Sequence, residues 1–196
     1  MVVTLRHTAI SQAVDRAPIF QASGGTFDAP ANIGQGSKNE ESLNLTLPLD
    51  KFGVTGGRFV VNVTQLQSQV TDPTTHTPRE ISGLHPVDAD LHFTQDLPAH
   101  RTWGVDYYVQ QRERYFRFNA VDTRKYEGQL DPFLEWKPRA DIQWRFEIDN
   151  AVDRSFKRSV DVFGGPRNIA ALTAIQNRLQ QPSRLFSIRL RKLFGV

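Results

Sequence analysis

The residues that most often carry out chemistry are scattered along this chain. It has no cysteine, which excludes disulfides, thiolate zinc sites and cysteine nucleophiles. The histidines show no metal-ligand spacing such as i, i+4 on a helix, and His92 occupies a polar position of an alternating segment, as a residue lining a wet surface would. No Gly-x-Ser-x-Gly elbow is present. The five histidines are His7, His76, His85, His92 and His100.

Two further patterns resemble functional motifs without meeting their requirements. The stretch 34–38, Gly-Gln-Gly-Ser-Lys, lacks the spacing of a phosphate-binding loop. Asp88 and Asp90 share one face of an extended segment, which strand geometry produces without any catalytic purpose. The sequence therefore predicts no enzyme, no metal site and no cofactor.

Composition narrows the class further. The 196 residues carry a net charge of +3, and the basic residues are dispersed rather than clustered, so we expect no nucleic-acid partner. No stretch approaches the ~18 apolar residues that a transmembrane helix requires. Strands of a membrane barrel, by contrast, alternate and keep the mean hydropathy low.

Apolar and polar residues alternate with a period of two along most of the chain. Alternation over roughly eight residues predicts a strand with one apolar and one wet face. The clearest segment places Ile142, Trp144, Phe146 and Ile148 against polar neighbours. Similar segments cover 41–49, 58–64, 87–94, 103–110 and 186–191.

The predicted connections are alternately short and long. Residues 50–57, 96–101 and 137–141 form short links, whereas 11–38, 71–85, 111–128 and 164–181 form long polar ones. Outer-membrane barrels have this asymmetry, with short periplasmic turns and longer extracellular loops. We therefore predict an all-β chain of about eight antiparallel up-and-down strands that forms part of a transmembrane barrel wall. In the last long link, apolar residues at helical spacing predict a short amphipathic helix over 168–180, as a rim-packing element or a ligand lid.

Aromatic residues gather close to the short links. All three tryptophans lie there in the apolar series of their strands, as in the girdle at a membrane interface. The alternative is that they form the core of a soluble barrel. The predicted girdle consists of Trp103, Trp136, Trp144, Phe93 and Phe194.

Several motifs in order resemble the hairpins of TonB-dependent receptors. The first is Asn-Ile-Gly-x-Gly at 32–36 followed by Leu-Pro-Leu-Asp-x-Phe-Gly-x-x-Gly at 47–56. Further matches lie at 68–73 with 81–83, and at 93–98 with 103–105. The closing stretch 190–194 resembles the aromatic-ended last strand by which the barrel-assembly machinery recognises such proteins. Gly195 and Val196 follow the terminal aromatic here, which departs from the family pattern.

The resemblance implies an outer-membrane receptor of a Gram-negative bacterium, without bond-making chemistry. Its family imports scarce ligands such as siderophores, cobalamin or oligosaccharides through a barrel of ~22 strands around a plug. Nothing in the chain resembles the plug or the TonB-contacting segment, and residues 1–7 resemble the inside of a strand rather than a signal peptide. We therefore expect residues 1–196 to be the C-terminal part of such a barrel, in contact with outer-membrane lipid. Its plug, its remaining strands and the contact with TonB are expected to lie upstream.

No family ligand residue can be matched onto this sequence. The best candidates for contacting a ligand lie in the predicted long loops, where arginines could bind anions through forked hydrogen bonds. Ordinary solvated loop charge is the alternative. The candidates are Arg112, Arg114, Tyr115, Arg124, Tyr126 and Arg167.

Two other functions remain open at this stage. An autonomous eight-stranded membrane barrel would serve a structural or adhesive role, since about eight strands can close with side chains filling the interior. A soluble β-sandwich or lipocalin-like binding module would fold without detergent.

Overall fold

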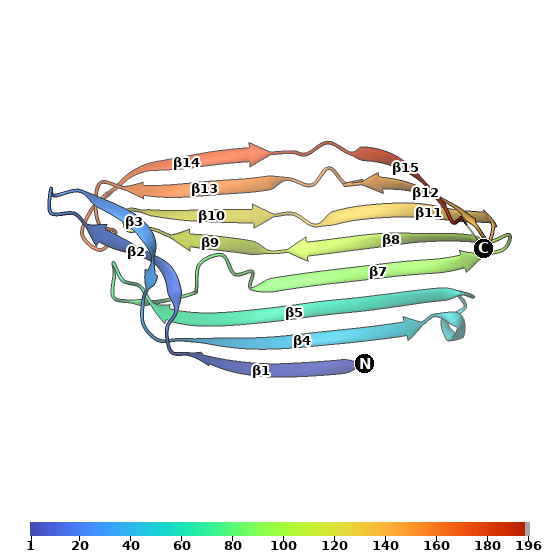
Figure 1. Ribbon diagram of the computed structural model, residues 1–196, viewed down its shortest axis with the longest axis horizontal. Coiled ribbons are helices and arrows are strands. Elements are labelled where there is room, and N and C mark those ends of the chain that lie inside the picture. Colours follow the sequence, from blue (N-terminus) through green and yellow to red (C-terminus); the bar gives the residue numbers. More distant parts are fainter. Residues whose placement is uncertain (195–196) are drawn as a thin grey trace.

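A computed structural model describes residues 1–194 and shows an all-β chain built from antiparallel strands (Figure 1). The largest sheet has nine strands. Eight of them follow the order β1-β4-β5-β7-β8-β11-β12-β15, and the short β6 pairs with β5. Their bounds are β1 Val2–Ile10, β4 Gly36–Pro48, β5 Gly57–Thr71, β6 Pro78–Arg79, β7 Val87–Leu97, β8 Arg101–Gln110, β11 Gln129–Arg139, β12 Ile142–Asp149 and β15 Leu185–Lys192.

A four-stranded sheet in the order β14-β13-β10-β9 extends the long strands beyond one end of this sheet. In Figure 1, β8 leads into β9, β10 into β11, β12 into β13 and β14 into β15. The bounds are β9 Arg112–Phe116, β10 Ala120–Tyr126, β13 Phe156–Phe163 and β14 Leu172–Gln180. The predicted number of long up-and-down strands is therefore confirmed.

The two ends of the strands differ as the sequence predicts. At one end the connections are short, and one of them contains the 3-10 helix η1, Asp50–Phe52. At the other end, the link after β1 contains a separate hairpin of β2, Val14–Phe20, and β3, Thr26–Asn32. The link after β5 contains β6. This second end is called the loop end below.

The long sheet is open within the described residues. β1 pairs only with β4, and β15 pairs only with β12, so each lies at an edge of the nine-stranded sheet. No pairing between residues 1–194 joins the two edges. The structure thus establishes the antiparallel all-β class, but not a closed barrel.

Antiparallel partners lie on the same face of a sheet, so the strand register defines two faces. The apolar face contains rows such as Leu45 opposite Val61, Val61 opposite Leu91, and Leu91 opposite Tyr107. Near the short turns, Trp136 lies opposite Trp144 and Trp144 opposite Leu190. The apolar series of successive strands therefore form one continuous surface.

The opposite, polar face collects the other half of each alternating series. Its rows include Ser42 opposite Thr64, and His92 opposite Asp106. Toward the short turns, Glu135 lies opposite Arg145. A one-residue shift of register would exchange the two faces, so this alternation is what fixes strand pairing.

Burial in this sheet is the reverse of that in a typical soluble domain. Among residues 1–194, the only buried apolar residues are small or medium in size: Ala13, Val70 and Ala120. The buried polar residues are more numerous: Asp72, Thr74, Glu113, Asp122, Asp131, Asn150 and Ser155. Large apolar side chains such as Phe186 and Ile188 are instead exposed. The fold therefore has no conventional hydrophobic core in its described part.

Two predicted elements are wrong. Residues 168–180 contain no helix; Leu172–Gln180 form β14 and pair with β13 along their length, with one irregularity near Phe163. The predicted loop 111–128 is mostly strand, because β9 and β10 continue the hairpin to a turn at 117–119. Cross-strand hydrogen bonding decides both cases, since a strand beside an existing edge gains a ladder that an isolated helix lacks.

Candidate functional site

The candidate site lies where the polar face meets the loop end. A cavity of about 430 Å³ opens there between the ends of β4, β5 and β7 and the segment that precedes β7. Carboxylates, a hydroxyl, an amide and an imidazole surround it, together with two leucines. Its lining consists of Glu40, Asn62, Thr64, Leu66, Gly83, Leu84, His85, Asp88 and Asp90.

His85 connects this cavity to a buried network around Glu113 on β9. The Nε2 atom of His85 lies 3.8 Å from the Glu113 carboxylate, and its ring packs edge-on against Tyr126. Glu113 accepts hydrogen bonds from Tyr115 at 3.0 Å, from Tyr126 at 2.8 Å and from Arg124 at 3.0 Å. Burial, and then the hydrogen bond to Glu113, raise the pKa of both tyrosines, which therefore remain neutral donors.

A second carboxylate continues this network along β10. Asp122 is almost fully buried and accepts a forked pair of hydrogen bonds from Arg158 at 2.9 and 2.8 Å. Burial alone would raise the pKa of Asp122, but the Arg158 hydrogen bonds and the charge of Arg124 lower it. These residues, His85, Glu113, Tyr115, Asp122, Arg124, Tyr126 and Arg158, are called the Glu113 cluster.

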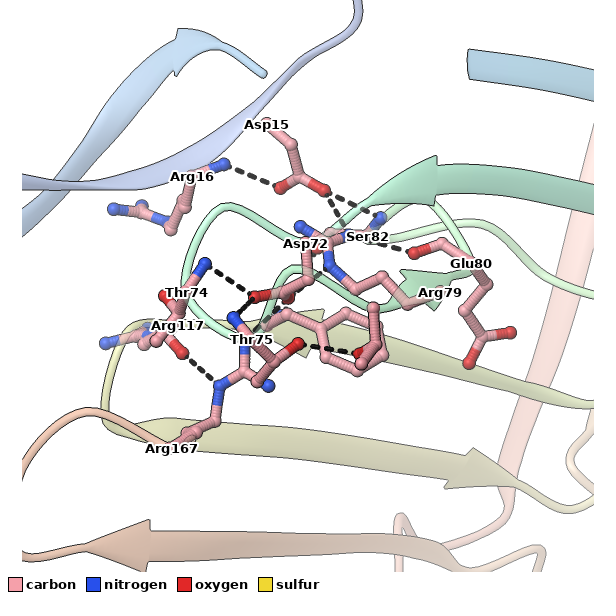
Figure 2. Close-up of polar contacts among 12 residues, drawn as sticks. Asp15, Arg16, Asp72, Thr74, Thr75, Arg79, Glu80, Ser82, Arg117 and Arg167 are labelled. Atoms are coloured by element: carbon pink, nitrogen blue, oxygen red, sulfur yellow. Dashed lines mark hydrogen bonds and ion pairs between the residues drawn. The ribbon is translucent and has the colours of Figure 1, made fainter. Parts of the chain in front are cut away.

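At the loop end, Asp72 is the centre of a second buried ionic group (Figure 2). One carboxylate oxygen accepts the N–H groups of Thr74 and Thr75, and the other meets Arg79 and Arg167, both at 2.6 Å. Burial alone would raise the pKa of Asp72, but these donors lower it to about 2. The carboxylate is therefore ionised under all ordinary conditions.

The same group also anchors the β2–β3 hairpin. Asp15 on β2 accepts hydrogen bonds from Arg79 at 2.8 Å and from the backbone N–H of Ser82 at 3.1 Å (Figure 2). In addition, Asp28 on β3 accepts the backbone N–H of Phe118 in the β9–β10 turn. We call Asp15, Asp72, Arg79 and Arg167 the loop clamp, because they join three separate connections of the loop end.

Nearer the short turns, the polar face carries a third network centred on Arg145. Its guanidinium bonds Glu135 at 3.0 Å and Glu147 at 2.9 Å, and it stacks 3.8 Å from the Phe133 ring. On neighbouring strands, His92 bonds Asp106 at 2.8 Å. His92 therefore belongs to the wet face, as predicted.

The six residues predicted to contact a ligand are all at the loop end, but five lie in strands rather than loops. Tyr115, Arg124 and Tyr126 meet around Glu113, as described above. Arg112 and Arg114 both point to Glu80, at 3.1 and 3.4 Å. Arg167 is in a loop and belongs to the clamp, with about 9% of its side chain exposed. Their positive charges are thus largely matched within the chain, and ligand contact by them stays a prediction.

The predicted girdle residues lie at the turn end of the sheet. Trp103 packs edge-on against Phe93 with ring centres 5.0 Å apart, and its Nε1 donates to Gln95 at 3.0 Å. Trp136 and Trp144 are cross-strand partners. Phe194 is 85% exposed and lies beneath the Lys192 ammonium. Their placement at a membrane surface stays a prediction.

Sequence reasoning missed the carboxylates that organise the site. Glu113 and Asp72 looked like ordinary charges of predicted loops, and nothing local marks them as buried. The period of two correctly predicts that Asp88 and Asp90 lie on the polar face. The cavity beside them, however, forms only because residues 83–85 pass next to these strands, which the sequence does not reveal. In the described part of the chain, no group of three or more His, Asp or Glu side chains could hold a metal ion.

Comparisons with protein-family models, with curated proteins and with solved structures gave no match to this chain. None of the described helices is long and apolar enough to cross a membrane.

Proposed function

We propose that this chain forms part of the wall of an outer-membrane β-barrel receptor. The observation that carries the proposal is the pattern of exposure: one continuous apolar face is exposed, while the opposite face of the same strands carries charged networks such as that of Arg145. In lipid, an exposed apolar face is favourable and a polar face lines a hydrated interior. In water, the same face would be a large aggregation-prone surface.

Within that class, we propose a TonB-dependent receptor that takes up scarce ligands of the siderophore, cobalamin or oligosaccharide type. The order of hairpin motifs supports this assignment, as does the concentration of elaborate links at one end of the strands. The cavity beside His85, Asp88 and Asp90 would then face the ligand path near its outer mouth. Transport itself would depend on a plug and on contact with TonB.

The test is the depth of the tryptophans in lipid. The full chain is refolded into phosphatidylcholine vesicles with brominated acyl chains, using variants that each retain one of Trp103, Trp136 and Trp144. We expect blue-shifted emission and strong quenching in all three, because these side chains lie on the apolar face near its turn end. Emission typical of water, unaffected by bromine, would contradict a membrane wall and favour a soluble module.

A second candidate is an autonomous small barrel, which the eight strands in sequential order favour. Strands in that number can close around a filled interior. Closure would require β1 to pair with β15, and this contact distinguishes the two candidates.

A further inference from the structure

The four-stranded sheet carries a row of cations across three of its strands. Lys125 on β10 lies directly opposite Arg112 on β9 and directly opposite Lys157 on β13. Lys157 in turn lies opposite Leu179 on the edge strand β14. We call Arg112, Lys125 and Lys157 the cation row.

The strand register places this row on the polar face. Tyr108 on β8 lies opposite both Asp90 and Gln129, and all three belong to the polar face. The pairing of β8 with β11 continues into that of β9 with β10 without a shift, since Tyr108 pairs with Gln129 and Arg112 pairs with Lys125. An even step along a strand keeps the same face, so Arg112 and Lys125 lie on the side of Tyr108 and Gln129. In the proposed barrel the cation row therefore faces the hydrated interior at the loop end.

The row carries more positive charge than its neighbours neutralise. Like charges in direct cross-strand register repel each other, so the row needs compensation. At one end, Arg112 shares the carboxylate of Glu80 with a second arginine. At the other end, Lys157 meets Glu127 at 2.9 Å. Lys125, in the middle, has no ion-pair partner within residues 1–194, so the centre of the row keeps an unmatched positive charge.

A groove of about 440 Å³ runs over the two lysines and over a neighbouring row of uncharged donors. In that neighbouring row Thr123 lies opposite Ser159, and Ser159 lies opposite Asn177. The three side chains make no hydrogen bond within the described residues, so their hydroxyl and amide groups are free to donate to a ligand. A carboxylate on this face, Asp161, lies one row further toward the loop end, opposite Val121. The groove thus combines ammonium groups with neutral donors, which together suit the oxygens of an anion.

We propose that the cation row and its neighbouring donors bind an oxyanion, a phosphate or carboxylate group, on the ligand that the receptor takes up. A lysine ammonium is a compact charge, and hydrogen bonds between ionised partners are about twice as strong as neutral ones. A neutral oligosaccharide would leave the excess charge of the row unmatched, so the row favours anionic ligands among the proposed classes. This inference rests on the proposed function and narrows its substrate class.

The experiment measures binding of radiolabelled pyrophosphate, citrate and maltotriose to the full chain by equilibrium dialysis at neutral pH. The chain is held in an uncharged polyoxyethylene detergent, which presents neither phosphate nor sugar. The variants are Lys125→Gln and Lys157→Gln, and the matched control is Lys38→Gln on the polar face of β4, where Lys38 lies 3.9 Å from Glu40. We expect at least one of the two anions to bind, and each row variant to weaken that binding by about tenfold. Lys38→Gln should leave it unchanged, and maltotriose should not compete.

The outcomes separate this inference from the proposed function, because tryptophan quenching by brominated lipid is measured on the same variants. Quenched tryptophans without binding of either anion, or an equal loss of binding in Lys38→Gln, would overturn the anion site and leave the wall intact. Anion binding that both row variants weaken, in a chain whose tryptophans emit as in water, would support the site and overturn the wall. Maltotriose binding that the same two variants weaken would overturn the preference for anions. Tighter binding of pyrophosphate than of citrate would assign the site to phosphate, and the reverse order to carboxylate.

Discussion

Asp72 shows how a single carboxylate can hold the loop end together. It is 1% exposed, and its two oxygens meet two backbone N–H groups and two guanidinium groups. A buried charge of this kind is tolerated only when its hydrogen bonds are complete. One buried nitrogen of Arg79, Nη2, has no partner among the described residues. Asp72 is the carboxylate that contacts both arginines of the clamp, so the compensation of their positive charge depends on it.

We predict that Asp72→Asn loosens the loop end by about 3–5 kcal/mol, because it leaves two buried guanidinium groups short of negative charge. Hydrogen exchange of the backbone amides of 72–83 measures the effect. Asp161→Asn makes the same chemical change without breaking an ion pair and should leave the exchange unaltered. Equal exchange in both variants would show that the clamp contributes nothing.

The same carboxylate predicts a pH dependence. Its pKa falls from an ordinary value of 3.8 to about 2 on folding. A lowered pKa stabilises the fold above the unfolded value, and this contribution is lost as the pH falls through the folded value. We expect protection of the loop end to be complete above about pH 4 and to decline by about 2 kcal/mol toward pH 1.

The neighbours of Gly104 leave no room for a side chain at this position. A Cβ there would lie 2.5 Å from both the Phe133 ring and the Phe93 carbonyl oxygen. We predict that Gly104→Ala lowers the free energy of unfolding by about 1–3 kcal/mol, because the carbonyl cannot move aside. A urea titration in lipid vesicles measures it. Gly165→Ala, whose Cβ would meet only Ala170 at 3.4 Å, is the control and should leave stability within about 0.5 kcal/mol.

At this scale the sequence predicts which face a residue lies on, but not what it touches. His92 and Arg145 follow directly from the period of two. The partners of Glu113 do not, because they come from β9, β10 and the segment before β7, and only the three-dimensional course of the chain brings these together.

At the scale of elements, β14 explains why a helix was predicted where a strand forms. Ile175 and Leu179 are four residues apart, which places them on one face of a helix and equally on one face of a strand. All nine residues of β14 are exposed, so no buried face resolves the ambiguity. The deciding factor is β13, whose edge pairs with β14 from Phe156 to Phe163.

The β2–β3 hairpin is an element held mainly by its anchors. We predict that Asp15→Ala speeds proteolytic cleavage at the hairpin tip, 21–25, about tenfold or more, because the hairpin loses its contacts with Arg79 and Ser82. Mass spectrometry of limited digests measures it. Arg16→Ala, which removes only a 3.4 Å contact inside the hairpin, should leave the cleavage rate unchanged. Identical rates in the two variants would argue against anchoring by Asp15.

At the scale of the whole molecule, the open edges distinguish a wall from a closed small barrel. The chain has no cysteine, so introduced pairs are unambiguous. We predict that Leu5→Cys, combined in turn with Phe186→Cys, Ile188→Cys or Leu190→Cys, forms no intramolecular disulfide in lipid vesicles. Non-reducing mass spectrometry detects the bond.

The positive control for this test is Val3→Cys with Leu43→Cys. These two residues are cross-strand partners, and their separation suits a disulfide. A disulfide between β1 and β15 would mean closure and would favour the autonomous barrel.

Much of the whole-molecule arrangement could be predicted from the sequence, because sequential hairpins require only alternation and turn positions. The strand number, the short links near 50–57 and 96–101, and the orientation of the faces all follow from these. Whether the sheet closes could not be predicted from the sequence. Closure depends on whether β1 pairs with β15, and the residue pattern of an edge strand does not specify which strand it pairs with.

The loop clamp also has a consequence for the order of assembly. Nearly every sheet contact joins strands that are neighbours in the chain, and such hairpins form early because little loop entropy is lost. The Asp72–Arg167 bond instead spans 95 residues and requires four intervening long strands to be in register. This bond can therefore form only when the sheet is correctly paired. A strand between residues 72 and 167 that pairs out of register would leave the buried charges of Asp72 and Arg167 without each other.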